Sequence, residues 1–239
     1  MIDTLMHWIG FGLCHQLPAR SLFGGAHQVP VCARDTGIYV GFIVSYLIVV
    51  AFARGSRPSE TPPVAILVLG IVLIAAMGVD GISSYAGWRA TSNELRLATG
   101  LGAGYAIGMF LVPLLNSELW RIPGRTRPLS RWWEGALWAF SIPVVWAVTW
   151  WLLPLLDIGY PMLVTVAILA TFTLVNLVLV ALLTPYERRA EHLRELVLPT
   201  LAAFGLTVLE LAGAAALKLW TIGVAADWLR ASGRGKAGS

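Results

Sequence analysis

Long runs of apolar residues alternate along the chain with short polar segments rich in arginine, glycine and proline. Six of these runs approach or exceed the roughly 20 residues that an α-helix needs to cross the hydrocarbon core of a bilayer. The pattern therefore predicts an all-α bundle of about six transmembrane helices. We place these helices over Thr36–Ala53, Pro62–Val79, Leu97–Leu115, Gly135–Leu156, Gly159–Leu183 and Leu198–Ala226.

Composition excludes a soluble protein. The 239 residues are 57% hydrophobic and only 13% charged, with a mean hydropathy of +0.74. A soluble domain carries roughly 25% charged residues, and its helices need polar faces that these runs lack. The segments "RGSRPSETPP", "RIPGRTRPLSR" and "TPYERRAEHLREL" separate successive apolar runs and contain the prolines, glycines and charges that are typical of loops. We therefore expect the chain to lie in a lipid bilayer.

The basic residues predict an orientation and exclude nucleic-acid binding. Fifteen of the 17 basic residues are arginine, and they lie between apolar runs rather than along one soluble basic stripe. One side of the predicted bundle receives nine arginines, and basic residues favour the cytoplasmic side. We therefore predict a multi-pass protein of the inner or plasma membrane whose N-terminal segment is extracytoplasmic. The nine are Arg54, Arg57, Arg121, Arg125, Arg127, Arg131, Arg188, Arg189 and Arg194, against Arg20, Arg34, Arg89, Arg96 and the tail residues Arg230, Arg234 and Lys236 on the other side.

The segment "CHQLPARSLFGGAHQVPVCARDTGIY", from Cys14 to Tyr39, contains both cysteines of the chain. Thiolate, imidazole and carboxylate are the usual zinc ligands, and the glycines and prolines between the cysteines allow the segment to fold back. Zinc binding, a Cys14–Cys32 disulfide and two unrelated packed thiols are all compatible with this spacing. The stretch before it, residues 1–13, is too short and too interrupted to span, and we expect an interfacial or re-entrant segment. The candidate metal ligands are Cys14, His15, His27, Cys32 and Asp35.

A second polar segment, Val79–Gly100, falls on the same predicted side as the cysteines. If it is helical from Trp88 onward, Arg89, Asn93 and Arg96 share one helix face. Arginine is the preferred side chain for bidentate recognition of phosphate or carboxylate, although charges at the ends of spans also act as interface anchors. The candidate residues for binding an anionic substrate are Arg20, Arg34, Arg89, Asn93 and Arg96, with Asp80 at the end of the preceding span.

These residues resemble the two signatures of the DUF2085 family of uncharacterised prokaryotic membrane proteins. The first signature is matched by Cys14, His15, Gln16, Pro18, Arg20 and Ser21, and then by Pro30, Cys32, Ala33, Arg34, Thr36, Gly37, Ile38, Tyr39 and Gly41. The second is matched by Asp80, Gly81, Gly87, Arg89, Ser92, Asn93, Arg96, Thr99 and Gly100. The resemblance extends from about Leu13 to Gly108 and implies a membrane protein, but it implies no known activity.

One position departs from the family pattern. Asp35 stands where the family has a cysteine. A disulfide or a CxxC redox pair that uses that cysteine cannot form in this chain, whereas aspartate can replace a thiolate as a metal ligand. The departure therefore favours a metal site over thiol redox chemistry.

The sequence thus predicts a membrane protein with a site at one end of the bundle. Cys14, His15, Cys32 and Asp35 are expected to bind a divalent metal, with zinc as the candidate cofactor. Asp80, Arg89 and Arg96 are the candidate catalytic residues, and Asp80 is expected to be a base or to orient a histidine. The partner is expected to be an anionic, lipid-linked group.

Two other functional classes are compatible with the same residues. In one, the chain is a structural or accessory subunit of a membrane complex or homo-oligomer, and its polar cluster only fastens the N-terminal loop to the bundle. In the other it is a transporter of small solutes or ions, with Glu210, Lys218 and Asp80 along the path. By organisation we expect residues 1–115 to carry the site, and residues 116–239 to form an additional three-helix membrane region.

Overall fold

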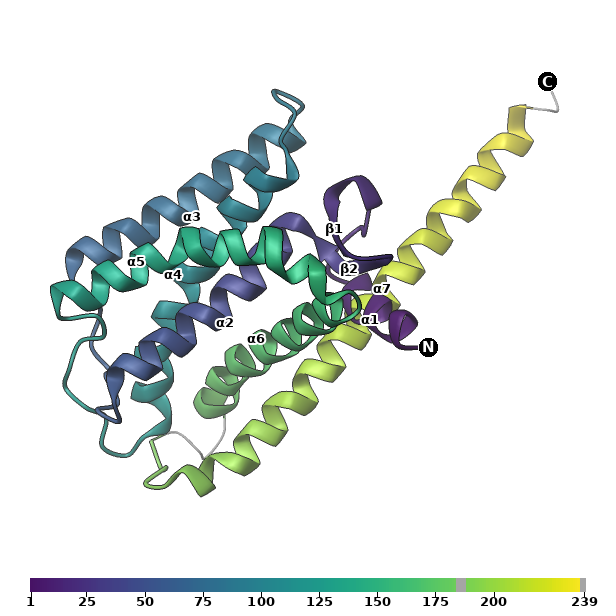
Figure 1. The fold of residues 1–239 in the computed structure, drawn as a ribbon. Coiled ribbons are helices and arrows are strands. Elements are labelled where there is room, and N and C mark those ends of the chain that lie inside the picture. The colour runs from purple at the N-terminus through teal and green to yellow at the C-terminus, as the bar shows by residue number, and fades with distance from the viewer. Residues whose placement is uncertain (184–187, 237–239) are drawn as a thin grey trace.

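The computed structural model describes residues 1–183 and 188–236, except for the side chains of residues 225–236. Its architecture is a helical bundle with one small hairpin near the N-terminus (Figure 1). In chain order the elements are α1 (Ile2–Phe11), β1 (Ser21–Gly24), β2 (His27–Cys32), α2 (Ala33–Ala53), α3 (Val64–Tyr85), α4 (Asn93–Leu119), α5 (Trp132–Ala147), α6 (Gly159–Leu183) and α7 (Val197–Lys236). Helix α5 continues through a π-turn at Val148–Leu152 and a 3-10 turn at Leu153–Leu156.

The prediction of six membrane-spanning helices is confirmed. In the described part of the chain, six helices are long and apolar enough to cross a membrane. They cover Ala33–Ala53, Val64–Tyr85, Asn93–Leu119, Trp132–Leu156, Gly159–Leu183 and Leu193–Val224. Helix α3 extends past the predicted end at Val79, because the carboxylate of Asp80 is paired inside the bundle and the helix continues through it. Helix α7 continues beyond the predicted end at Ala226, and the tail cations Arg230, Arg234 and Lys236 lie outside the described side chains.

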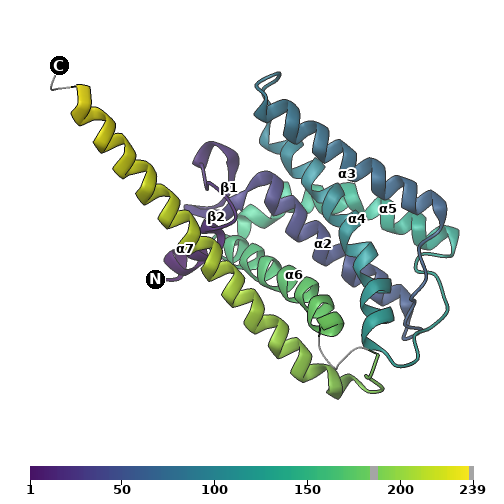
Figure 2. The ribbon, with the colours of Figure 1, turned by 180° about the vertical axis from the view of Figure 1, so that it is seen from behind.

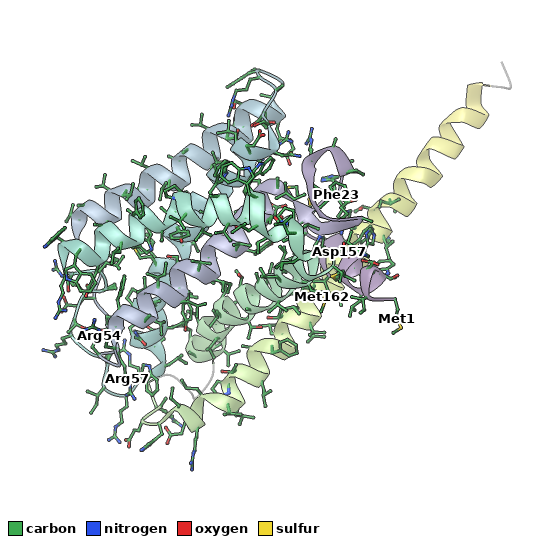
Figure 3. All side chains as sticks on the ribbon, viewed as in Figure 1. Met1, Phe23, Arg54, Arg57, Asp157 and Met162 are labelled. Carbon is green, nitrogen blue, oxygen red and sulfur yellow. The ribbon has the colours of Figure 1, made fainter. Side chains whose placement is uncertain are left out.

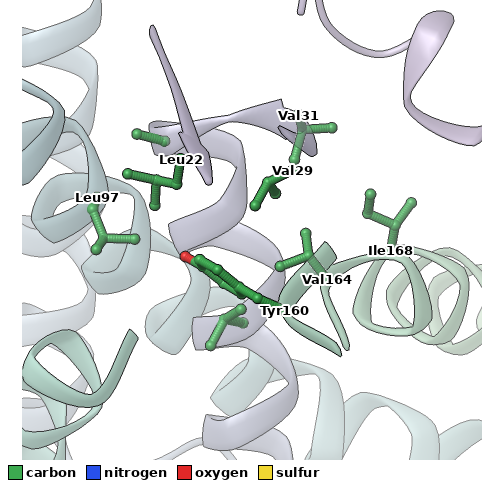
Figure 4. Packing of buried hydrophobic residues seen from close by; sticks show 9 residues of the cluster. Leu22, Val29, Val31, Leu97, Tyr160, Val164 and Ile168 are labelled. Carbon is green, nitrogen blue, oxygen red and sulfur yellow. The ribbon is translucent and has the colours of Figure 1, made fainter. Parts of the chain in front are cut away.

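A β-hairpin that the apolar pattern did not predict folds the N-terminal segment back on itself. Strands β1 and β2 are antiparallel, and Ser21 lies opposite Cys32. Gly25 opens the two-residue turn with a φ of +54°, a conformation that suits glycine. The inner face of the hairpin packs on α6, where Val29 and Val31 of β2 meet Tyr160, Val164 and Ile168 (Figure 4).

A seam of glycines joins α2 to α4. At five glycines the backbone of one helix contacts the backbone of the other. These are Gly37 and Gly41 of α2, and Gly100, Gly104 and Gly108 of α4. A methyl group built on Gly104 would lie 2.2 Å from the carbonyl oxygen of Ile38, and one on Gly100 would lie 2.0 Å from that of Arg34. Small residues four apart allow this close approach in membrane helices, where van der Waals packing drives association.

Buried hydrogen bonds connect α5 to this pair of helices. The Ser45 hydroxyl of α2 donates to the carbonyl oxygen of Tyr105 in α4 (2.7 Å), and the Trp138 indole of α5 donates to the Ser45 hydroxyl (2.8 Å). The Tyr105 hydroxyl lies 3.0 Å from that of Ser141, also in α5. Satisfied polar groups of this kind fix the relative register of helices in a low-dielectric interior.

The remaining helices flank the α2–α4 pair. Helix α3 packs along α4, whereas α6 and α7 pair with each other on the other side (Figures 1 and 2). The bundle has two distinct ends, and Figure 3 labels Arg54 and Arg57 at one and Phe23 and Asp157 at the other. We call these the arginine end, formed by the loops around Arg54–Pro63, Trp120–Arg131 and Arg188–Leu196, and the cysteine end, which carries the hairpin.

Candidate functional site

The two cysteines meet where the hairpin joins the bundle. Cys14 follows α1 in the loop before β1, and its amide donates to the carbonyl oxygen of Gly10 (3.0 Å). Cys32 ends β2 and is also the N-cap of α2. The backbone N–H of Cys32 donates to the Cys14 sulfur at 3.3 Å. The fold therefore brings together two thiols that are 18 residues apart in the sequence.

Asp35 completes a group of three potential metal ligands. The sulfur atoms of Cys14 and Cys32 and a carboxylate oxygen of Asp35 all lie within 4.8 Å of one another. Both cysteines are free thiols, and Cys32 Sγ lies 3.2 Å from Asp35 Oδ2, within hydrogen-bonding distance. Asp35 lies in the first turn of α2, three residues after Cys32, so the helix directs both side chains to one place. Two sulfurs and one carboxylate oxygen form a donor set that zinc accepts, and a zinc ion held by these three residues would have room for a fourth ligand.

The histidines do not join this group. His15 is exposed and lines the same cavity as the cysteines, but its ring nitrogens are not among the clustered ligand atoms. His27 is directed away from the site, with Nδ1 2.8 Å from Asp3 Oδ1 and Nε2 4.0 Å from Asp157 Oδ1. The four-residue ligand set that we predicted is therefore reduced in the structure to Cys14, Cys32 and Asp35.

The two thiols differ in acidity because they share a hydrogen bond. The Cys32 thiol lowers the pKa of Cys14 to about 7, with a smaller contribution from the backbone of Gln16. The same bond, together with burial and the neighbouring Asp35 carboxylate, raises the pKa of Cys32. Near neutral pH Cys32 therefore stays protonated while about half of Cys14 is thiolate, so Cys14 is the more nucleophilic sulfur.

This asymmetry predicts selective alkylation in metal-free protein. A thiol with a pKa of about 7 is about one-tenth ionised at pH 6 and about nine-tenths at pH 8, so the rate of iodoacetamide modification at Cys14 should rise about tenfold over that range. Cys32 should stay unmodified. Peptide mass spectrometry after timed labelling measures both sites. The Cys32→Ala variant should move the Cys14 midpoint upward, and equal rates at the two cysteines would contradict the assignment.

The ligand group opens into a cavity of about 220 Å³ at the cysteine end. Three guanidinium groups, from Arg20, Arg34 and Arg96, share its walls with the ligands. The guanidinium of Arg20 also lies 5.8 Å from the ring centre of Tyr85. Arginine side chains are chemically suited to phosphate or carboxylate groups, and of these three only Arg34 has its charge offset by Asp80. The complete lining is Leu13, Cys14, His15, Leu17, Arg20, Cys32, Arg34, Asp35, Ser84, Tyr85 and Arg96.

Asp80 lies behind this cavity and is saturated with hydrogen bonds. Its carboxylate accepts from Arg34 Nη2 (2.5 Å), from Arg89 Nη2 (2.5 Å) and from the Thr91 hydroxyl (2.7 Å). The Thr99 hydroxyl of α4 adds a longer bond at 3.3 Å. Only 1% of Asp80 is exposed, and no histidine is among these partners. We had expected a base or a partner of histidine, but the carboxylate instead anchors arginines from two segments.

The second predicted segment is not one continuous helix. Ser92 is the N-cap of α4 and accepts from the Leu95 amide at 3.3 Å, so the helix begins at Asn93. Arg89 precedes the helix, because the chain turns at Gly87 with a φ of +73°. The predicted common face of Arg89, Asn93 and Arg96 is therefore wrong, and Arg89 bonds Asp80 and the Ser83 hydroxyl instead of lining the cavity.

Asn93 and Arg96 retain the predicted proximity. Arg96 Nη1 donates to Asn93 Oδ1 at 2.9 Å, and Asn93 Nδ2 donates to the carbonyl oxygen of Ala19 at 3.2 Å. Asn93 thus fastens the loop before β1 to α4 and orients Arg96, which faces the cavity. Of the predicted substrate-binding residues, Arg20, Arg34 and Arg96 line the cavity, whereas Arg89 and Asn93 support it.

Lys218 supports the site by holding the backbone around Cys14, a role that the sequence did not lead us to predict. Lys218 of α7 donates to the carbonyl oxygens of Phe11 (2.6 Å) and Cys14 (2.7 Å) and lies over the Phe11 ring. The signal was a lysine inside an apolar span, which must find acceptors or reach water. We had considered Lys218 and Glu210 as parts of a transport path. In the structure Glu210 accepts from the amide of Asn176 at 2.7 Å, so both have local partners.

Comparison with known proteins supports the membrane assignment. The family model described as "Predicted membrane protein (DUF2085)" matches residues 14–110. An uncharacterised protein of Methanocaldococcus jannaschii is 33% identical over 109 residues, which cover 46% of this chain and 67% of the relative. An uncharacterised protein of Methanothermobacter thermautotrophicus is 33% identical over 101 residues, covering 41% and 82%.

The chain belongs to the DUF2085 family. No solved structure matches this DUF2085 protein significantly. The family match contains the cysteine segment, Asp80 and every residue of the cavity wall except Leu13, and it ends inside α4. Helix α7, which contributes Lys218, lies outside the matched residues of the family.

Proposed function

We propose that this membrane protein binds one divalent metal ion, zinc by the chemistry of its donors, at Cys14, Cys32 and Asp35, and holds an anionic group beside it. The observation that carries the proposal is the convergence of these three ligand atoms within 4.8 Å on the wall of an arginine-lined cavity. Three protein ligands with an open position are typical of reactive zinc sites rather than of purely structural ones.

The arginines of the cavity indicate which kind of anion it would bind. Arg20 and Arg96 face the cavity without an acidic partner among the described residues, whereas the charge of Arg34 is offset by Asp80. A phosphate or carboxylate group placed between Arg20 and Arg96 would satisfy both guanidiniums. The cavity borders the last turn of α3, at Ser84 and Tyr85, and the first turn of α4, at Arg96. A lipid-linked phosphate would reach this position from the bilayer. The compatible reaction class is hydrolysis or transfer of that phosphate group, in which the metal would activate the attacking nucleophile.

The cavity separates this proposal from a purely structural role. A clamp that only fastens the N-terminal loop would leave its polar groups paired and enclose no space. The Asp80 network fits that description, since its carboxylate is fully paired. The ligands and Arg20 and Arg96 do not fit it, because they border a cavity of about 220 Å³. We therefore assign Asp80 to support and the cavity to binding.

The test is the metal content of purified protein, measured by elemental mass spectrometry. Wild-type protein is expected to contain about one zinc ion per chain, and Cys32→Ser should contain almost none because one of three ligands is lost. His27→Gln is the matched control, since His27 lies in the same segment but outside the ligand group, and it should keep the metal. Lys218→Met should lose part of the metal, because the Cys14 carbonyl is released.

Two outcomes would overturn the metal assignment. Wild-type protein without metal, and lighter by two hydrogens per chain, would make Cys14 and Cys32 a disulfide. Metal that persists in both Cys32→Ser and Cys14→Ser would place the ion elsewhere. If zinc is confirmed, a titration with a short-chain phosphatidic acid tests the anion, and Arg96→Gln should weaken its binding about tenfold.

A further inference from the structure

A second hollow, of about 280 Å³, lies at the opposite end of the bundle from the cysteines. It is bounded by the last turn of α2 and by the loop that leads into α5. Helix α2 has 21 residues, so its two ends, and with them the two cavities, are separated by about 30 Å. This hollow is therefore independent of the proposed metal site.

Three arginines surround the hollow, and their charges are only partly compensated. Arg127 pairs with Glu60 at 3.3 Å, and Arg131 Nε lies 4.0 Å from Glu134. Glu134 is already engaged, because its Oε2 accepts the backbone N–H of Arg131 as part of the cap of α5. Within the described part of the chain, no acidic side chain pairs with Arg54. The hollow thus keeps an excess of positive charge.

Apolar side chains line part of the hollow, next to the ends of two spans. They belong to Val49, Phe52 and Leu129, and α2 ends at Ala53 while α5 begins at Trp132. The ring of Trp133 meets that of Phe52 edge to face, with the ring centres 5.6 Å apart. Tryptophan is typical of the headgroup level of a bilayer. A hollow lined by both arginines and apolar side chains at this level matches an amphiphile with an anionic head.

We propose that this hollow binds the phosphate of an anionic phospholipid headgroup, with Arg54 and Arg131 as the guanidinium groups that grip it. Arginine forms bidentate, charge-assisted hydrogen bonds with phosphate oxygens. Pockets for drug-sized ligands have volumes of about 300–1,000 Å³, so a hollow of about 280 Å³ suits a headgroup better than a whole molecule. Basic pockets between helix ends are known to take such headgroups. The arginines of this end thereby gain a binding role in addition to orienting the chain.

The test titrates full-length protein in a neutral detergent with dioctanoyl phosphatidylglycerol, dioctanoyl phosphatidylcholine and inorganic phosphate, and follows binding by native mass spectrometry. Wild-type protein is expected to bind the phosphatidylglycerol at least about tenfold more tightly than the phosphatidylcholine. Arg54→Gln and Arg131→Gln should each weaken that binding about tenfold, since each removes a charge-assisted contact with phosphate. Thermal unfolding of each variant verifies that it is folded.

Two controls separate this site from general attraction and from the cysteine end. Arg125 lies exposed in the same loop but does not line the hollow, so Arg125→Gln should bind within about twofold of wild type. Arg96→Gln alters only the other cavity and should also leave this binding unchanged. Equal losses in Arg125→Gln and Arg54→Gln would overturn the proposal. If inorganic phosphate bound as tightly as the phosphatidylglycerol, the proposal of a lipid ligand would be wrong, and the ligand would be free phosphate.

Discussion

Asp80→Asn is expected to lower the free energy of unfolding by about 3–5 kcal/mol, the cost of removing one partner from a buried ion pair. The Asp80 side chain is 2% exposed and that of Arg34 is 12% exposed, so the guanidinium would remain in the bundle without its counter-charge. The Asn side chain has almost the same shape, which isolates the effect of charge. Unfolding by sodium dodecyl sulfate in mixed micelles, followed by circular dichroism, measures the change.

The control for Asp80→Asn is Asp157→Asn. The Asp157 side chain is 63% exposed and lies 4.0 Å from His27, and exposed pairs contribute about 0–1 kcal/mol. The double variant Asp80→Leu with Arg34→Met should recover much of the lost stability, because an apolar pair of similar volume often replaces a buried ion pair without cost. Unchanged stability in Asp80→Asn would show that the carboxylate is not the anchor that its hydrogen bonds indicate.

Gly104→Ala is expected to be destabilising by about 3 kcal/mol, although alanine is the better helix former. The added methyl group would lie 2.2 Å from the Ile38 carbonyl oxygen and 2.8 Å from the Phe42 nitrogen. Both are backbone atoms that no side-chain rotation can move aside, so α2 and α4 must separate. The same denaturant titration measures the loss.

Gly205→Ala provides the comparison for the seam. A methyl group on Gly205 of α7 meets nothing within 4 Å, so this change should leave stability the same or raise it by up to about 1 kcal/mol. If Gly104→Ala and Gly205→Ala behaved alike, the close approach of α2 and α4 would not be what holds them together.

The apolar pattern was sufficient to predict the transmembrane helices. Each helix must cross the hydrocarbon core with its own apolar residues, so the requirement is local in the sequence. Cysteine chemistry and spacing also grouped Cys14, Cys32 and Asp35 before any distance was available, although the same group included His15, which the structure leaves outside it. The hairpin was missed because its residues, such as Val29 and Val31, form a run too short to distinguish a strand from a loop. The pairing of such a run depends on α6, which is distant in sequence.

The roles of individual charged residues were harder to predict than their location. Arg89 was assigned to a helix face, yet Gly87 and Ser92 form a turn and a cap immediately around it. Those two residues were the available signal for a helix beginning at Asn93. The function of Asp80 depends on Arg34, which is 46 residues away, and no local pattern specifies such a pairing. The four-residue spacing of Gly100, Gly104 and Gly108 indicates a helix contact, but not which helix it meets.

The glycine seam also has a consequence for how the chain is made. Helix α2 and its partner α4 are not consecutive, and residues in contact across the seam, such as Ser45 and Tyr105, are 60 positions apart. At about 5–20 residues per second, α2 must wait about 3–12 seconds after its own synthesis before α4 emerges. During that interval the surface of α2 at Gly37 and Gly41 faces lipid or the insertion machinery. During biogenesis α2 must therefore remain inserted without its packing partner until α4, the third span, has been synthesised.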